Sequence, residues 1–459
     1  MIKLICSLGF LLFFAKVSSA QNCHCSDEFL FLKGFMEKNY VGFGDKVRPD
    51  TRLRYDSVSA EVGRRAVAET RPVFCLALLK GWLGFFRDDH NYITGSPEKP
   101  SASDAAEVVR INPKVLALLK GRRKGIEGVY HTADSAYKIV ILKNTKNGRD
   151  YAGVILSSRV PAWKRGQVKL ELKRVDARHF LAAAYLRNHN VDAENLIFDG
   201  ESFSDDSWIR EGAAPRRPRQ QWPAVQARSI SDKTFYIGIG SFDESNTVAV
   251  DSLFRADDSI LRSTPNLILD IRGNGGGSDF VYDPILPWLY SNPIFAAGVS
   301  VRATDDNIKG WSALLDEKDI PESGKQYLRR IITQMQGYSG ELREIAADQT
   351  VTLPEVRPFP EKVVLLINGD CASSAEQFIL ETMQSRKVTL MGQPTRGVLD
   401  YANVRVAAFP CLPLALNYAT TRSRRVDMGK GIDNVGIKPE IVLTMDQDWI
   451  LEARKFLEK

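Results

Sequence analysis

The fold is decided by the stretch Asn266-Leu-Ile-Leu-Asp-Ile-Arg-Gly-Asn-Gly-Gly-Gly277. Its first half is a short apolar run, which is typical of a buried strand in a parallel sheet. Its second half holds four glycines within five residues, so the backbone can approach a ligand closely and point N–H groups at an anion. Because the loop lacks the endings of a phosphate-binding loop, an oxyanion is the better candidate. A tight structural turn explains the glycines equally well.

A second strand-to-turn junction reads Ile367-Asn-Gly-Asp-Cys-Ala-Ser-Ser-Ala-Glu376. The apolar run before it predicts a buried strand, and the apolar spacing after it predicts a helix. Small residues around Ser373 allow its hydroxyl to project above the sheet, as in a nucleophile elbow, although the usual Gly-x-Ser-x-Gly pattern is absent. Ser373-x-x-Glu376 is also a capping box, which requires no catalysis.

Working outward, the pattern predicts an α/β core over residues 230–459, with strands and helices alternating. Residues 21–115 are predicted to form an N-terminal helical domain, with helix over 26–110, and residues 116–200 a small β-rich domain. Residues 201–229 are polar and rich in proline and arginine, which indicates a linker. Residues 322–347 are predicted to be a helical insertion.

The overall composition excludes several classes of protein. Of 459 residues, 44% are hydrophobic and 26% are charged, which rules out a mostly disordered chain, a collagen and a coiled coil. A net charge of +6 gives no argument for binding to nucleic acid. Six cysteines are too few for a disulfide scaffold.

The N-terminus resembles a secretory signal peptide that is cleaved after Ala20. A basic start, a short apolar run and small residues at 18–20 follow the order that a signal peptidase reads. We therefore expect an exported protein, periplasmic or extracellular, without stable membrane insertion after cleavage. The mature chain would keep an odd number of cysteines, so at least one stays free or pairs between chains, and the pairing is left open. These are Cys23, Cys25, Cys75, Cys371 and Cys411.

Together the two junctions resemble the carboxyl-terminal processing (tail-specific) serine protease family. The segments Gly392-Gln-Pro-Thr-Arg-Gly397 and Gly436-Ile-Lys-Pro-Glu-Ile441 match further motifs of that family. The resemblance covers residues 230–445 well and 62–95 more weakly. It implies a crotonase/ClpP-like core and a serine endopeptidase that cleaves proteins or peptides, with Ser373 as nucleophile. The oxyanion hole would take N–H groups from Ser374 and from Gly275 or Gly276.

Many members of the family use a lysine base, but that position holds Val398 here. The resemblance is therefore to the branch without the lysine, the tricorn-like Ser-His-acid enzymes. His90, in Arg87-Asp-Asp-His90, matches the histidine of the family, and Asp433 matches its acid, with Asp400 in reserve. Such a relay needs no metal and no cofactor.

Two other interpretations stay open. The missing lysine favours a non-catalytic peptide-binding or scaffold protein that keeps the protease fold. An acyl-CoA enzyme of the crotonase type fits poorly with export. The β-rich residues occupy the place where the family often carries a PDZ domain, but the PDZ signatures are missing. The oligomeric state is not predicted.

Overall fold

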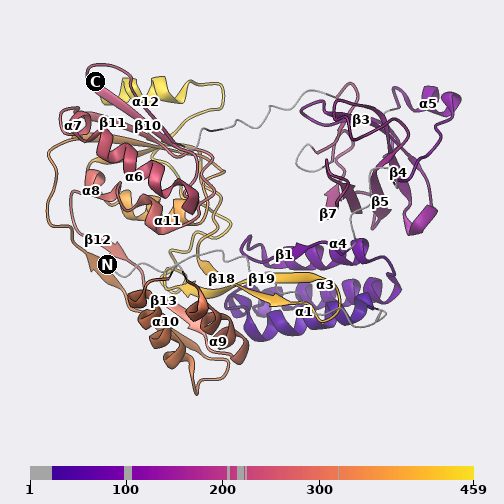
Figure 1. The fold of residues 1–459 in the computed structure, drawn as a ribbon, viewed down its shortest axis with the longest axis horizontal. Coiled ribbons are helices and arrows are strands. Elements are labelled where there is room, and N and C mark those ends of the chain that lie inside the picture. The colour runs from indigo at the N-terminus through magenta and orange to yellow at the C-terminus, as the bar shows by residue number, and fades with distance from the viewer. Residues whose placement is uncertain are drawn as a thin grey trace.

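The computed structural model describes residues 23–97, 106–122, 124–203, 207–213, 222, 225–318 and 320–459. The predicted signal peptide, residues 1–20, lies outside these ranges. The fold is mixed α/β and comprises N-terminal helices, a β half-barrel and an α/β core (Figure 1). In the part of the chain that is described, no helix combines the length and the hydropathy needed to cross a membrane.

The core is built on a six-stranded sheet with the strand order β20-β17-β16-β11-β10-β9. All neighbouring pairs are parallel except β10 and β9. Strand β11 is buried throughout, and β16 is buried after its exposed first residue, Lys362, so both agree with the predicted buried strands. The strands are β9 (Val225–Ser229), β10 (Thr234–Ile239), β11 (Asn266–Asp270), β16 (Lys362–Ile367), β17 (Val388–Gly392) and β20 (Ile441–Val442).

Helices cover both faces of this sheet, and β11 and β16 lie side by side at its centre. One face packs against α6, α7, α8 and α11 and the other against α12 (Figure 1). Because β11 and β16 are parallel neighbours, the turns that follow them meet at the same edge. The helices are α6 (Thr247–Ala256), α7 (Asp258–Leu261), α8 (Leu286–Leu289), α11 (Ser374–Thr382) and α12 (Trp449–Leu457).

A five-stranded sheet lies between the core and the N-terminal helices. Strand β19 pairs with β18 along one edge and with β1 and β13 along the other, and β14 pairs with β13. The strands are β1 (Tyr92–Gly95), β13 (Val299–Arg302), β14 (Leu342–Ala346), β18 (Tyr401–Ala408) and β19 (Leu414–Ser423). A separate pair joins β12 (Ile294–Ala296) to β15 (Gln349–Val351).

The N-terminal helices share one buried apolar cluster with β18 and β19 on one side and with β6 and β7 of the half-barrel on the other. They are α1 (Cys25–Asn39), α2 (Phe43–Lys46), α3 (Pro49–Ala68) and α4 (Pro72–Leu83). The prediction of helix over 26–110 is wrong at Tyr92–Gly95, which pairs with β19 as a strand, and part of that range lies outside the described residues. The helical prediction for 322–347 is confirmed over α10 (Glu322–Met335) and wrong over Leu342–Ala346, which forms β14. Helix α9 (Asp305–Ser312) precedes α10.

The β half-barrel is a seven-stranded antiparallel sheet with the order β7-β6-β5-β4-β3-β2-β8. Strands β2 to β7 lie within residues 116–200, which were predicted to be rich in β-structure. The strands are β2 (Gly128–His131), β3 (Tyr137–Lys143), β4 (Tyr151–Ser158), β5 (Val168–Arg174), β6 (His179–Tyr185), β7 (Val191–Ile197) and β8 (Ile209–Arg210); α5 (Pro113–Leu119) precedes them. The predicted linker 201–229 contains β8 and β9 and lies partly outside the described residues. The division into domains stays a prediction.

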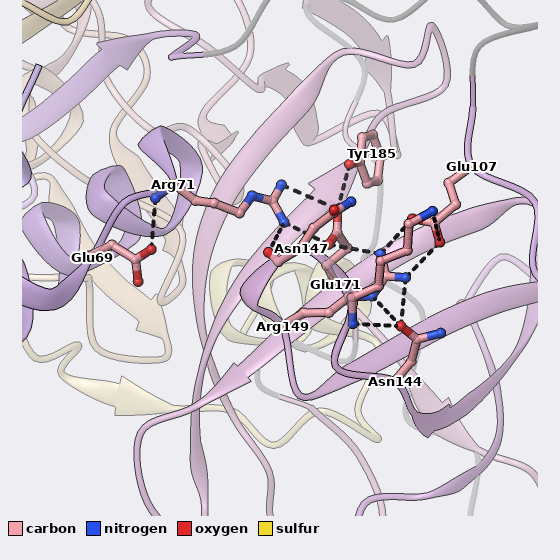
Figure 2. Close-up of polar contacts among 9 residues, drawn as sticks. Glu69, Arg71, Glu107, Asn144, Asn147, Arg149, Glu171 and Tyr185 are labelled. Carbon is pink, nitrogen blue, oxygen red and sulfur yellow. Dashed lines mark hydrogen bonds and ion pairs between the residues drawn. The ribbon is translucent and has the colours of Figure 1, made fainter. Parts of the chain in front are cut away.

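A buried ionic network joins the half-barrel to the helices (Figure 2). All five N–H donors of Arg149, whose side chain is fully buried, find acceptors on Glu107, Glu171 and Asn144. Glu171 also accepts from Arg71 at the start of α4, at 2.7 Å, and from the Tyr185 hydroxyl. One carboxylate thus links the two parts of the molecule.

Four of the five cysteines in the described residues form two disulfides, Cys23–Cys411 and Cys25–Cys75. The first joins the residues before α1 to the turn between β18 and β19, and the second joins α1 to α4. Cys371 is free and buried. The odd count is therefore resolved by one free thiol within the core.

Candidate active site

Ser373 lies in a sharp turn between β16 and α11. Its backbone has φ 54° and ψ −124°, a conformation that costs free energy for any residue other than glycine. The Ser373 N–H donates to the Val398 carbonyl at 3.0 Å. The strand, the strained turn and the helix together reproduce the geometry of a nucleophile elbow.

Glu376 holds the turn in place. Its buried carboxylate accepts hydrogen bonds from the N–H groups of Gly397 and Val398, both at 2.7 Å, and from the Thr395 hydroxyl. It also accepts from the Ser373 N–H at 3.3 Å, as the predicted capping box requires. Because Val398 takes part through its backbone, this loop positions Ser373 without contributing a base.

The glycine loop after β11 packs directly against Ser373. A Cβ atom on Gly276 would lie 2.9 Å from the Ser373 Cβ and 2.7 Å from the Ala372 carbonyl, so only glycine fits there. The Gly276 N–H donates to the Asn274 side chain at 3.0 Å. Within the described residues, the N–H groups of Gly275 and Ser374 have no acceptor. Of the predicted oxyanion donors, Gly275 and Ser374 therefore stay available, and Gly276 is engaged.

His90 reaches Ser373 from the N-terminal helices. It follows α4 and the left-handed turn at Arg87 (φ 48°). The His90 Nε2 lies 3.2 Å from the Ser373 Oγ, although the two residues are 283 positions apart. The His90 side chain is 15% exposed. The structure thus brings together the predicted serine and the predicted histidine.

Asp88, which the sequence analysis did not single out, is the carboxylate beside the histidine ring. Its Oδ1 lies 3.6 Å from the His90 Nδ1 and accepts from the His90 backbone N–H at 3.0 Å. Its Oδ2 accepts from the Tyr40 hydroxyl at 2.8 Å and from the Asn91 side chain at 3.0 Å. The signal that points to it is its place two residues before the histidine.

Asp433, the predicted acid, is not hydrogen-bonded to His90. Its Oδ1 accepts from the N–H groups of Leu399 and Asp400, and its Oδ2 accepts from the Lys46 ammonium at 3.2 Å. The reserve candidate Asp400 is buried and accepts from the Asp433 N–H and from Arg425. Both carboxylates accept hydrogen bonds from backbone N–H groups of the loops beside the site. Within the described residues, neither carboxylate is hydrogen-bonded to the His90 ring.

The charges of these groups influence each other. Burial alone would lower the pKa of His90, but the nearby carboxylates of Asp88 and Asp433 raise it above its usual value. Burial would raise the pKa of Asp88, yet the contacts with His90 and Tyr40 hold it below its usual value. Burial and the charge of Asp88 raise the pKa of Asp433 to about 6, against the effect of Lys46. Asp88 is therefore the ionised partner of the ring at neutral pH.

A cavity of about 170 Å³ opens beside Ser373 and Ser374. Strands β12, β13 and β15, helix α11 and the loop after β17 line it, and His90 does not. Among the described residues, one group has the spacing of a metal site, namely Cys23, Glu28 and Cys411. Two of its members form a disulfide, which leaves them unavailable as thiolate ligands.

Comparison with protein families gives one match, which covers part of the chain. The model of peptidase family S41 matches residues 233–443. These residues therefore belong to peptidase family S41, whose members are serine-type peptidases. The matched segment contains the glycine loop, Ser373 and Asp433. His90 and Asp88 lie before it.

Solved structures with similar folds cover nearly the whole chain. A mutant of CPAF is 13% identical, with a TM-score of 0.51 over 95% of this chain and 96% of that one. Mature CPAF complexed with lactacystin gives 15% identity and a TM-score of 0.49 over 95% and 97%. The photosystem II D1 C-terminal processing protease is 14% identical, with a TM-score of 0.39 over 95% of this chain and 98% of that one. A search of curated proteins found no significant match. At these identities the likeness concerns the fold alone.

Proposed function

We propose that the protein is an exported serine endopeptidase of the Ser-His-acid type, with Ser373 as nucleophile and His90 as general base. The observation that carries the proposal is the 3.2 Å contact between His90 Nε2 and Ser373 Oγ at the strained turn. A serine hydroxyl is a weak nucleophile until a base accepts its proton. The distance lies at the limit of a hydrogen bond between a nucleophile and its base in a site without substrate.

The reaction begins when Ser373 Oγ attacks the carbonyl carbon of the scissile peptide bond. His90 Nε2 takes the hydroxyl proton, and the carbonyl oxygen becomes an oxyanion. As the tetrahedral intermediate collapses, the protonated ring gives this proton to the leaving amine. A water molecule then attacks the acyl-enzyme with His90 again as base, which releases the second product and restores Ser373.

Asp88, and not Asp433, is the acid of this proposal. In the productive tautomer, the neutral His90 ring carries its proton on Nδ1, which faces the Asp88 carboxylate, and Nε2 is free to accept the serine proton. The same carboxylate stabilises the ring once it is protonated and positively charged. Tyr40 and Asn91 fix the carboxylate in turn. Asp433 acts on the ring only through its charge.

The oxyanion would be stabilised by the backbone N–H groups of Gly275 and Ser374. Removing one such donor typically costs about 3 kcal/mol of transition-state stabilisation. Val398 in place of the family's lysine supports the lysine-free, tricorn-like branch, and the helix-covered parallel sheet supports a crotonase/ClpP-like core. The two disulfides and the signal-like N-terminus support export.

Cleavage of an unfolded protein substrate by the oxidised mature chain tests the proposal. We expect Ser373→Ala and His90→Ala to abolish cleavage. His179→Ala removes a histidine that also pairs with an aspartate, Asp176, but on the exposed half-barrel, and it should cleave like the wild type. Cleavage by the Ser373→Ala variant would contradict the assignment of Ser373 as the nucleophile.

The alternative is a peptide-binding or scaffold protein without catalysis, which Val398 at the lysine position favours. In that case the wild type binds unfolded peptide but neither cleaves it nor reacts with a fluorophosphonate. A reaction at Ser373 excludes this alternative, because an unactivated serine does not react at an appreciable rate.

A further inference from the structure

Asn274 lies in the middle of the glycine loop and is fully buried, with 0% of its surface exposed. Its side chain makes three hydrogen bonds, all to backbone groups. The Oδ1 atom accepts from the N–H groups of Gly276 at 3.0 Å and Phe242 at 3.2 Å, and the Nδ2 atom donates to the Ile239 carbonyl at 3.1 Å. A buried amide is costly unless its polar atoms are paired, and both polar atoms of this amide are paired.

These contacts attach the glycine loop to the chain that follows β10. Ile239 is the last residue of β10, and Phe242 lies three residues further on. The Phe242 N–H also donates to the Gly276 carbonyl at 3.2 Å, and the Ser278 N–H donates to the Phe242 carbonyl at 2.8 Å. Because β10 and β11 are parallel neighbours, the Asn274 side chain fixes one side of the loop on the adjacent strand of the central sheet.

The main chain of Asn274 attaches the other side of the loop to the nucleophile turn. The N–H of Ala372, one residue before Ser373, donates to the Asn274 carbonyl at 3.1 Å. A peptide unit is planar, so this bond also sets the direction of the Gly275 N–H, which belongs to the same unit. The Gly275 N–H is one of the two donors proposed for the oxyanion hole.

Gly275 itself is not held by packing. It is exposed, and a Cβ atom at this position would meet nothing within 4 Å in the described structure. Glycine also populates a wide range of backbone conformations.

The two peptide units that flank Gly275 are fixed instead by Asn274. The Asn274 carbonyl holds the first unit at the Ala372 N–H, and the Asn274 Oδ1 holds the second unit at the Gly276 N–H. The conformation of Gly275 therefore depends on Asn274 on both sides.

We propose that Asn274 is a positioning residue for the oxyanion hole and keeps the Gly275 N–H in place relative to the Ser374 N–H. Because the Asn274 side chain is buried, it acts through the backbone of Gly275 and not on the substrate. Donors that are already in place stabilise an oxyanion without a reorganisation cost during the reaction. This inference rests on the proposed function, since it concerns the same site.

The test compares Asn274→Ala with Asn274→Ser in steady-state cleavage of an internally quenched peptide. Alanine removes the three side-chain bonds, so we expect kcat to fall by about 100-fold, as when one oxyanion donor is lost, while KM changes by less than about twofold. A serine hydroxyl can accept from the N–H two residues further on, so Asn274→Ser should recover part of kcat. Asn246→Ala is the matched control, because Asn246 also donates to a backbone carbonyl after β10, that of Ser241 at 3.2 Å, and it should keep the wild-type kcat.

A peptide aldehyde separates a loss of positioning from a general loss of structure. Ser373 Oγ bonds to the aldehyde carbon, the π electron pair moves to the oxygen, and the hydroxyl proton passes to His90, so the adduct carries the oxyanion. In Asn274→Ala the inhibition constant of the aldehyde should rise by about as much as kcat falls. The corresponding peptide alcohol forms no adduct, and its inhibition constant should stay unchanged. If Asn274→Ala does not fold, Asn274→Ser carries the same comparison.

A wild-type kcat in Asn274→Ala, or equal losses of affinity for the aldehyde and the alcohol, would overturn this inference. Labelling of wild-type Ser373 by a small fluorophosphonate separates it from the proposed function. Labelling together with an unchanged kcat in Asn274→Ala removes only the role of Asn274, whereas absence of labelling removes the proposed function itself.

Discussion

The N-terminal helices make two junctions, and these differ in how they handle buried charge. At the half-barrel, all five N–H donors of Arg149 form hydrogen bonds to Glu107, Glu171 and Asn144 (Figure 2). At the core, His90 meets a strained Ser373 across 3.2 Å, with its Nδ1 3.6 Å from Asp88. The first junction is saturated and therefore structural. The second leaves bonding capacity for a substrate, which is characteristic of a functional site.

The largest expected effect comes from the charge beside the histidine. Asp88→Asn should lower kcat by about 10³–10⁴-fold, because an amide favours the wrong tautomer and does not stabilise the charged ring. Asp433→Asn keeps an oxygen for the N–H groups of Leu399 and Asp400 and should cost tenfold at most. Steady-state kinetics on both variants checks this. A larger loss of kcat in Asp433→Asn than in Asp88→Asn would show that Asp433 is the acid, as the sequence predicted.

The saturated junction should respond in stability. Arg149→Met leaves the buried Glu171 with Arg71 alone and the partly buried Glu107 with Lys146 alone, and the free energy of unfolding should fall by about 3 kcal/mol. Arg187→Met is the control, since Arg187 forms an exposed pair with Asp134 and should cost less than about 1 kcal/mol. Denaturant unfolding measures both. Equal effects would show that the network contributes no more than a surface pair.

A smaller effect is expected at Lys46, which connects α2 to Asp433 at the junction with the core. Lys46→Met should destabilise the protein by about 1–3 kcal/mol at pH 7.5, where Asp433, with a pKa of about 6, is ionised. At pH 5 the carboxyl is largely protonated, so the loss should shrink. The sign follows from the raised pKa, because the folded state binds this proton more tightly than the unfolded chain does. Unfolding at the two pH values provides the measurement, and a loss that grows at pH 5 would contradict it.

The smallest effect is a displacement of the pH profile. The raised pKa of His90 means that the acid limb of kcat/KM should have its midpoint above 6.5. In Asp88→Asn this midpoint should move to lower pH. By the same linkage, protonated His90 stabilises the fold at low pH, and this contribution is lost as pH rises through the folded-state pKa. A wild-type midpoint below 6.5 would contradict the assigned surroundings of the ring.

The core and the nucleophile could be predicted from sequence because both depend on local patterns. The buried strand β11 and the turn at Ser373 are contiguous signals, and the family resemblance pointed to His90. Asp88 was not predicted, although it lies two residues before His90, because this spacing alone does not show that the carboxylate faces the histidine ring. Strand β6 was missed because three consecutive alanines carry little strand preference. Strand β1 was missed because its partner lies more than 300 residues away.

The claim that His90 activates Ser373 is tested most directly by the rate and position of fluorophosphonate labelling, followed by peptide mapping. The account predicts a single modified residue, Ser373, and a labelling rate in His90→Ala that is at least a thousandfold lower at pH 8. A label on another serine, or an unchanged rate in His90→Ala, would contradict it.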